Sequence, residues 1–304
     1  MTRNLNLRRW QPTHRNMLCA LLVGLFLILP FGKAQSAIPQ VLNVGNGGEP
    51  KDLDPHITTG VPEFHILMNL MEGLVAKHPK TLEPIPGVAE KWKMSKDGKT
   101  YTFFLRKNAK WSNGDAVTAQ DFIYSWSRLL KAETASEYAY QAFYIKNGKA
   151  FNEGKIKDPA QLGVKAIDPY TLEIQLENPT PFFLSLLFHH SLYPVHQATV
   201  EKFGTRWTRP ENFVSNGPFV LSKWEVNKVV SLKPNPFYWD KATVKLEEAN
   251  FFPIDKHETE EKMFRAKNLH TVDDLPLEKL PTWQKDTSGV FKTHPYLGTY
   301  YYWF

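Results

Sequence analysis

The segment that most constrains the fold is residues 88–126, because its local signals describe one consistent unit. Two short runs rich in aromatic and β-prone residues, 92–94 and 101–105, flank an Asp-Gly pair at residues 97–98. Glycine accepts a positive φ there without a Cβ clash, so the pattern predicts a β-hairpin. A second turn is expected at residues 112–115.

A helix is predicted directly after this second turn. Thr118 can cap it, and Asp121 three residues later completes an acidic variant of the capping box. Apolar residues then recur at helical spacing on one face, namely Phe122, Trp126, Leu129 and Leu130. The segment therefore predicts an ordered α+β core unit, and it indicates architecture without any chemistry.

Composition and charge narrow the class of protein. A chain of 304 residues that is 42% hydrophobic can bury a large core in one or two domains. Its net charge of +6 comes mostly from the first 37 residues, which hold five basic residues and no acid. The rest is almost neutral, which argues against nucleic acid as a partner because phosphate binding needs a concentrated basic face.

The N-terminus has the pattern of a signal peptide, predicted to cover residues 1–37. An arginine-bearing segment precedes an apolar run at residues 17–31, and small residues follow near a cleavage site at residues 36–37. The run is shorter than the roughly 20 residues of a membrane span, although an uncleaved anchor is the alternative. Cys19 is the only cysteine, so the exported chain would have no disulfide. Export from a Gram-negative cell would place it in the periplasm.

The remaining chain mixes strand and helix patterns. Alternating or β-rich runs predict strands at residues 38–44, 163–167, 171–176, 219–226, 229–234 and 244–252. Helical spacing is found at residues 64–74 and 259–267. Segments without a regular pattern are expected to be loops or linkers, at residues 45–48, 81–86 and 147–158. The fold class predicted from these patterns is α+β.

Residues that could carry chemistry give no catalytic constellation. Metal ligands could come from His189, His190 and His196, but no acidic ligand stands at helical spacing and no HExxH motif exists. A hydrogen-bonded structural role is therefore favoured for these histidines, and a metal-dependent hydrolase remains an alternative. The acidic pairs at residues 260–261 and 273–274 lie in polar runs, where a solvated face is expected. Binding without a cofactor or metal is favoured over catalysis.

Several motifs together resemble the family 5 extracellular solute-binding proteins, and among these the periplasmic oligopeptide and murein-peptide binders. The resemblance is carried in chain order by residues 54–56, 60–63, 72–74, 86–126, 163–168, 201–204, 216–219 and 299–302. It implies a mixed α/β fold with a lobe like that of type II periplasmic binding proteins and a small extra β-rich domain.

The resemblance also implies domain boundaries. Residues 38–75 and 196–297 would form the first ligand-binding lobe, and residues 76–195 a small accessory domain. Residues 298–304 would begin the crossover to a second lobe. Full relatives continue far beyond this point, so the chain would be C-terminally truncated, with the second lobe missing.

The residues implied to contact peptide are Thr59, Gly60, Val61, Tyr138, His189, Gly298 and Tyr301. Val61 would act through its backbone, Tyr138 as a pocket aromatic, and His189 near the cleft. Relatives often have an acid at the position of Thr59 and a cysteine at that of Gly298. The corresponding charge contact and disulfide are therefore not expected here.

The function implied by the resemblance is that of the periplasmic substrate-binding component of a peptide ABC transporter. Short peptides would bind in extended form between two lobes, through main-chain pairing that is independent of side chains. The implied partners are short peptides and an inner-membrane ABC permease complex, and the protein would be a monomer. One lobe of such a two-lobed protein would bind peptide only once the other lobe is restored. The alternative is a degenerate, chaperone-like periplasmic interaction protein without a transport function.

Overall fold

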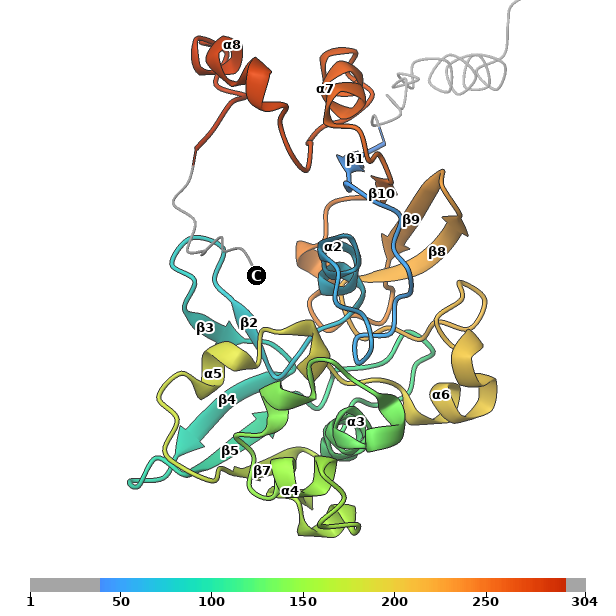
Figure 1. The fold of residues 1–304 in the computed structure, drawn as a ribbon. Coiled ribbons are helices and arrows are strands. Elements are labelled where there is room, and N and C mark those ends of the chain that lie inside the picture. Colours follow the sequence, from blue (N-terminus) through green and yellow to red (C-terminus); the bar gives the residue numbers. More distant parts are fainter. Residues whose placement is uncertain (1–38, 294–304) are drawn as a thin grey trace, which may run out of the picture. The chain divides into compact units, whose positions relative to one another are not determined.

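The computed structural model describes residues 39–293, and the predicted signal peptide and crossover segment lie outside this range. The described chain builds two four-stranded sheets and a two-stranded one (Figure 1). No helix within residues 39–293 is long and apolar enough to cross a membrane. The fold is mixed α/β, as the sequence predicts.

The first four-stranded sheet has the order β1-β10-β9-β8. Its strands are β1 (Val41–Gly45), β10 (Glu248–Phe252), β9 (Val229–Pro234) and β8 (Phe219–Glu225). Strand β1 pairs parallel to β10, whereas the other neighbours are antiparallel. Helix α2 (Val61–Leu70) contacts β8 and buries Ile66, Leu67 and Leu70. These side chains belong to one hydrophobic cluster with Trp207, Leu221 and Leu232, called here the α2 core.

The second four-stranded sheet has the order β4-β5-β7-β6 and is entirely antiparallel. Its strands are β4 (Ala89–Met94), β5 (Thr100–Leu105), β7 (Thr171–Gln175) and β6 (Val164–Asp168). Both hairpins predicted from the sequence are present, and Gly98 has the expected positive φ of 69°. This sheet and its covering helix form a separate cluster that includes Phe103, Trp126 and Leu172, called here the α3 core.

Helix α3 (Ala119–Leu130) confirms the predicted cap and buried face. The Asp121 carboxylate accepts the backbone N–H of Thr118 at 2.7 Å, as the capping box requires. The apolar face is completely buried: Phe122, Trp126, Leu129 and Leu130. The Trp126 indole N–H donates to the Leu192 carbonyl at 3.0 Å, which ties α3 to a distant segment.

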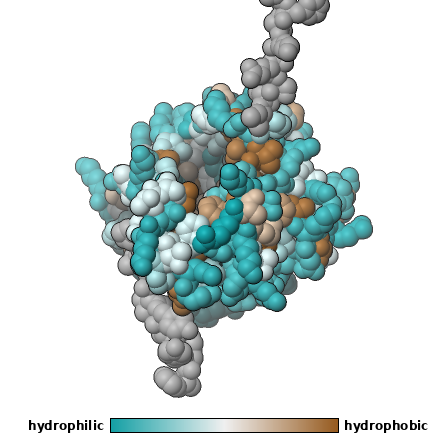
Figure 2. Space-filling view, turned by 90° about the horizontal axis from the view of Figure 1, so that it is seen from above, coloured by the Kyte–Doolittle hydropathy of each residue, from teal (hydrophilic) through white to brown (hydrophobic). Residues whose placement is uncertain are grey.

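Shorter strands and α-helices are found in the rest of the described chain. They are β2 (Val75–Lys77), β3 (Pro84–Pro86), α4 (Gly148–Asn152), α5 (Phe183–Leu186), α6 (Gln197–Phe203), α7 (His257–Arg265) and α8 (Leu280–Gln284). The surface drawn in Figure 2 is mostly hydrophilic, with hydrophobic patches toward the middle of that face. Exposed apolar area on this face is thus gathered in patches rather than spread evenly.

Several sequence predictions are wrong in detail. The segment 81–86 is no simple linker, because Pro84–Pro86 pairs as β3 with β2. Proline is tolerated there because a strand at the edge of a sheet need not donate every N–H to a neighbour. The expected surface loop 147–158 contains α4, because Phe151 is buried and Asn152 donates to the Leu130 carbonyl. Helix α2 begins earlier than predicted, since Pro62 fits its first turn.

The prediction of a solvated acidic pair is also wrong. Glu260 and Glu261 lie on α7 and are almost completely buried. Glu260 accepts the backbone N–H of Asp273 at 3.0 Å. Glu261 accepts the indole N–H of Trp283 at 3.2 Å and pairs with Arg265. Segments distant in the sequence therefore cover both carboxyls, which a local polar pattern cannot reveal.

Candidate functional site

A tight turn precedes α2 and leads to the predicted contact segment. The Asp54 carbonyl accepts the backbone N–H groups of Ile57 and Thr58, and also the Thr58 hydroxyl at 2.9 Å. The Asp54 carboxylate accepts the backbone N–H of His56 at 2.9 Å. One buried residue therefore fixes the whole turn from both its main chain and its side chain.

The Asp54 carboxylate is also paired with a cation from the other core. Arg128 on α3 donates to both carboxylate oxygens, at 2.5 Å and 2.9 Å, and the Trp207 indole adds a bond at 3.2 Å. Burial alone would raise the pKa of Asp54, but the hydrogen bond and charge of Arg128 outweigh it, so the pKa is lowered. The turn before α2 is thus clamped to α3.

His56 completes this clamp as a neutral side chain. Its Nδ1 accepts from Arg128 at 2.8 Å, so its Nε2 carries the proton and donates to the Tyr193 carbonyl at 3.2 Å. Burial, and next the charge of Arg128, lower the pKa of His56 to about 4. The charge of the clamp is therefore confined to the pair of Asp54 and Arg128.

Three of the predicted contact residues come together just after this turn. The Tyr138 hydroxyl donates to the Thr59 carbonyl at 3.4 Å, and its ring meets that of His189 edge-on at 4.4 Å. The adjacent His190 stacks on His189 at 4.4 Å and donates from Nε2 to the Thr58 carbonyl at 3.1 Å. Thr59, Tyr138 and His189 thus form one patch, called here the candidate site.

Gly60 and Val61 extend the candidate site into the first turn of α2. A Cβ on Gly60 would lie 1.9 Å from a carboxylate oxygen of Glu63, so only glycine fits without displacing that side chain. Glu63 is buried and accepts the backbone N–H of Lys51 at 2.6 Å. The Val61 side chain is 58% exposed, so the surface beside it is open to a ligand.

The histidines of the candidate site are neutral. His189 accepts the Ser191 hydroxyl at Nδ1 over 2.8 Å, with the Ser191 backbone N–H at 3.3 Å. Burial, and next the neighbouring His190, lower the pKa of His189 to about 4. Burial also lowers the pKa of His190. An uncharged patch of this kind suits hydrogen bonding to a peptide backbone better than recognition of a charge.

The remaining residues singled out from the sequence lie outside the described range or at another place in the fold. Gly298 and Tyr301 lie outside the described residues. His196 instead interacts with Asp115 at 3.0 Å and with Thr199 at 2.7 Å. Within residues 39–293, no group of three or more histidine, cysteine or acidic side chains could hold a metal ion. The alternative metal site is therefore not formed by the three histidines.

Two aromatic residues at the candidate site were not predicted. Tyr140 is half-exposed, and its ring lies 6.1 Å from that of Tyr138. Phe64 lies on α2, with its ring 5.7 Å from that of His190. The aromatic-rich sequence after Tyr138 could have indicated Tyr140. The helical spacing of Phe64 resembles that of any core residue, so the sequence offers no specific signal for it.

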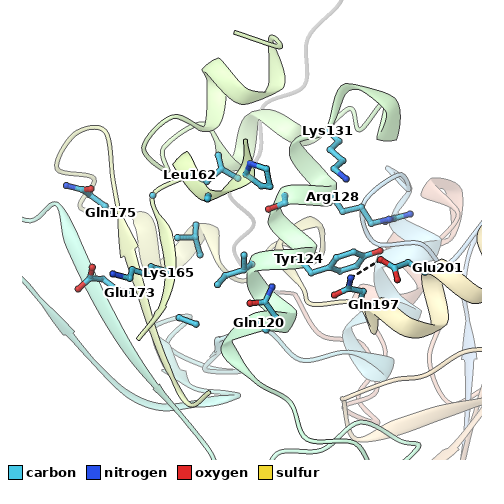
Figure 3. Close-up of a pocket in the computed structure, with 17 residues that line it drawn as sticks. Gln120, Tyr124, Arg128, Lys131, Leu162, Lys165, Glu173, Gln175, Gln197 and Glu201 are labelled. Atoms are coloured by element: carbon cyan, nitrogen blue, oxygen red, sulfur yellow. Dashed lines mark hydrogen bonds between the residues drawn. The ribbon is translucent and has the colours of Figure 1, made fainter. Parts of the chain in front are cut away.

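One large cavity in the described chain lies away from the candidate site. It has a volume of about 990 Å³ and lies between α3 and β6 (Figure 3). Its lining is mixed, since it includes Lys131, Lys165 and Glu173, and it includes none of the predicted contact residues. Arg128 reaches it but is already bonded to Asp54. The candidate site is therefore better supported by its bonding pattern than by cavity size.

Comparison with known proteins places these observations in a family. Residues 83–304 match the model of the bacterial extracellular solute-binding proteins, family 5 Middle. The periplasmic oligopeptide-binding protein OppA of Salmonella typhimurium is 43% identical over 273 residues, which are 88% of this chain and 49% of the relative. The periplasmic murein peptide-binding protein MppA of Escherichia coli is 42% identical over 256 residues, 84% of this chain and 47% of the relative.

Solved structures agree with the sequence matches. The Escherichia coli murein tripeptide binding protein MppA has a TM-score of 0.80 at 40% identity, covering 83% of this chain and 49% of that one. Haemophilus influenzae OppA in complex with RPPGFSPFR has a TM-score of 0.79 at 39% identity, covering 83% and 50%. The chain thus spans about half the length of the relatives it matches, consistent with one lobe, and the predicted resemblance is confirmed. This protein belongs to the bacterial extracellular solute-binding proteins of family 5.

Proposed function

We propose that this chain provides the first lobe of the substrate-binding component of a peptide ABC transporter in the periplasm. Peptides would bind in extended form along Thr59, Gly60 and Val61, with Tyr138 and His189 beside them. The observation that carries the proposal is the neutral, pre-positioned patch at the end of the clamped turn. Backbone recognition needs such a patch, because every peptide offers the same main-chain groups.

The proposed partners follow from the family rather than from a contact in the structure. The Haemophilus influenzae relative was solved with a peptide, which supports short peptides as ligands here. An inner-membrane ABC permease would receive the loaded protein, and the chain would act without catalysis. We further propose a first lobe at residues 38–75 and 196–297 and an accessory domain at residues 76–195. The separate α2 and α3 cores support such a division into two parts, although Leu74 and Val75 pack in the α3 core and Tyr193 and Val195 in the α2 core.

Calorimetry with trialanine can test this proposal on two proteins. One is residues 38–304, and the other joins the same residues to the C-terminal half of Salmonella typhimurium OppA. We expect measurable affinity only for the joined protein, because one lobe cannot enclose a peptide. Tight binding by residues 38–304 alone would contradict the need for a second lobe, and no binding by the joined protein would contradict the function.

Substitutions in the joined protein test the candidate site itself. Tyr138→Ala and His189→Ala should each weaken trialanine binding about tenfold, which is typical of a central interface side chain. Tyr144→Ala is the matched control, because this tyrosine packs on Phe182 and not on the candidate site. If Tyr144→Ala weakened binding as much as Tyr138→Ala, the candidate site would be wrongly placed.

A further inference from the structure

Another cavity lies beside α2 and includes Phe64 in its lining. It has a volume of about 350 Å³ and is lined by residues of α2, β2 and the turn after β9. Its apolar walls include Phe64, Met68, Ala76 and Phe188. The Phe64 ring also lies 5.7 Å from that of His190, which stacks on His189 of the candidate site. The cavity therefore shares a wall with the candidate site but has a lining of its own.

Glu72 and Tyr238 line this cavity, and hydrogen bonds from Tyr238 and from two residues outside the lining hold the Glu72 residue. Tyr238 donates to one oxygen of Glu72 at 2.6 Å, and the Trp239 indole N–H donates to the other at 2.7 Å. Asn216 bonds both the N–H and the C=O of Glu72, at 3.0 Å and 2.8 Å. The Glu72 carboxyl is thus held in one position from both its side chain and its main chain.

No described cation is hydrogen-bonded to this carboxyl in residues 39–293. The positive charge of Arg106 acts on Glu72, but Arg106 itself stacks on Trp239 at 3.6 Å and donates to the Gly87 carbonyl. Asp240 and Tyr193 are the other titratable groups that interact with Glu72, and Lys77 lies on the cavity wall. Burial, opposed by these hydrogen bonds and by Arg106, raises the pKa of Glu72 to about 7.

These features match a small-ligand site. Such sites are concave and mostly apolar, with a few convergent polar groups, and volumes upward of about 300 Å³. Each carboxylate oxygen can accept more than one hydrogen bond, so Glu72 retains capacity for a donor. Aromatic rings around the carboxyl, including Tyr193 and Tyr238, also attract a cation through their faces.

We propose that this cavity binds an ammonium group carried on an aromatic or branched apolar body, with Glu72 as its acceptor. The inference does not depend on the proposed transport function. The same chemistry is offered by a free amine and by the amino terminus of a peptide with an apolar first residue. Two probes separate these sources: 2-phenylethylamine, and the amide of Phe-Gly-Gly.

Calorimetry at pH 7 on residues 38–304 tests the ligand class. We expect 2-phenylethylamine to bind at least tenfold more tightly than 2-phenylethanol, which has a similar shape and no charge. Amine binding should release protons, because it favours the ionised form of a carboxyl whose pKa is raised to about 7. Proton release is measured by repeating the titration in buffers of different ionisation enthalpy. Equal affinity for amine and alcohol would overturn the proposal.

Two variants locate the binding. Met68→Trp should weaken amine binding at least tenfold by filling the cavity, while Met94→Trp, at an exposed position on β4, should not. Glu72→Gln should abolish proton release, but it also changes the bonds to Tyr238 and Trp239, so Met68→Trp is the decisive variant. Unchanged binding by Met68→Trp would overturn the assignment.

The same titrations distinguish a peptide amino terminus from a free amine as the ligand, and they distinguish binding in the cavity from binding at the candidate site. If the peptide amide binds as tightly as the amine and is lost in Met68→Trp, the site takes peptide amino termini. If only the amine binds, it takes free amines. Tyr138→Ala should leave amine affinity unchanged. An equal loss in Tyr138→Ala would place the ammonium at the candidate site and overturn a separate cavity site.

Discussion

The two turns that flank α2 each bury a carboxyl, but the two carboxyls are treated differently. Asp54, before the helix, is bonded by the guanidinium of Arg128, and its pKa is lowered. Glu72, after the helix, is bonded by a phenol and an indole, and its pKa is raised to about 7. Burial alone raises the pKa of a carboxyl. The difference between Asp54 and Glu72 is therefore explained by the cation that is hydrogen-bonded to Asp54 and absent from the hydrogen bonds of Glu72.

The two turns also play corresponding structural roles. Asp54 joins the turn before α2 to helix α3 of the other core. Glu72 bonds Tyr238 and Trp239 after β9, and Trp239 is covered by Arg106 from the segment after β5. Each end of α2 is therefore attached to the α3 core through one acidic residue. The turn before α2 is attached through an ion pair, whereas the turn after it is attached through hydrogen bonds from neutral donors.

The strongest test of this contrast removes the cation from the first turn. Arg128→Met should lower the free energy of unfolding by about 3–5 kcal/mol, because it leaves Asp54 buried and uncompensated. Urea denaturation measures the change, and Arg209→Met, which loses an arginine stacked near Trp224, is the control. The double variant with Asp54→Asn should recover part of the loss. Equal effects of Arg128→Met and the control would show that the ion pair is dispensable.

The second turn should respond to pH instead. The pKa of Glu72 is raised on folding, so its contribution is complete below about pH 4.5 and is lost as pH rises through about 7. The full loss would be roughly 3 kcal/mol. Glu72→Gln should reduce this part of the pH dependence, measured as the difference in unfolding free energy between wild type and variant from pH 4 to pH 8. A difference that does not change with pH would contradict the raised pKa.

A third buried carboxyl, that of Glu63, lies on α2 between the two turns. A substitution at Gly60 tests how tightly the surrounding atoms pack against it. Gly60→Ala should destabilise the protein by about 1–3 kcal/mol, because the new Cβ meets the Glu63 carboxylate. Gly48→Ala is the control, since its Cβ would meet nothing closer than Asp255 at 3.3 Å. Thermal and urea unfolding should rank the two variants in this order. The reverse order would mean that Glu63 moves away at little cost.

The smallest effect on stability is expected at the capping box of α3, where Thr118 is bonded to the carboxylate of Asp121. Thr118→Ala should cost about 1 kcal/mol, because it weakens the capping box formed with Asp121 at the start of α3. The change in urea midpoint should be well below that of Arg128→Met on the same helix. A loss as large as that of Arg128→Met would indicate that the cap supports more than the first turn of α3.

Local signals explain what the sequence could predict about the fold. The turn at Gly98, the cap of Thr118 with Asp121, and the apolar face of α3 each depend on residues within a few positions of one another. Such interactions form in the same way wherever the segment lies. The hairpins and α3 were therefore predicted correctly, whereas the burial of Glu260 depends on the distant Asp273 segment and was not.

The candidate site depended on resemblance, because its contacts join distant parts of the chain. Tyr138 and Thr59 are 79 positions apart, and Arg128 and Asp54 are 74. No periodicity in the sequence connects such pairs. The resemblance named Thr59, Tyr138 and His189 as contact residues but gave no account of the clamp behind them. The contribution of Asp54 and Arg128 became visible only from the packing of α3 against the turn.

The clamped turn has a thermodynamic consequence for any peptide that binds beside Thr59. The carbonyl groups of Thr58 and Thr59 are already bonded to His190 and Tyr138, so this main chain has little conformational freedom left to lose. Ordering a flexible side chain at an interface costs about 0.5–1.5 kcal/mol, and a turn that is ordered beforehand avoids a comparable entropic penalty. The ligand would then contribute most of the entropy lost on association.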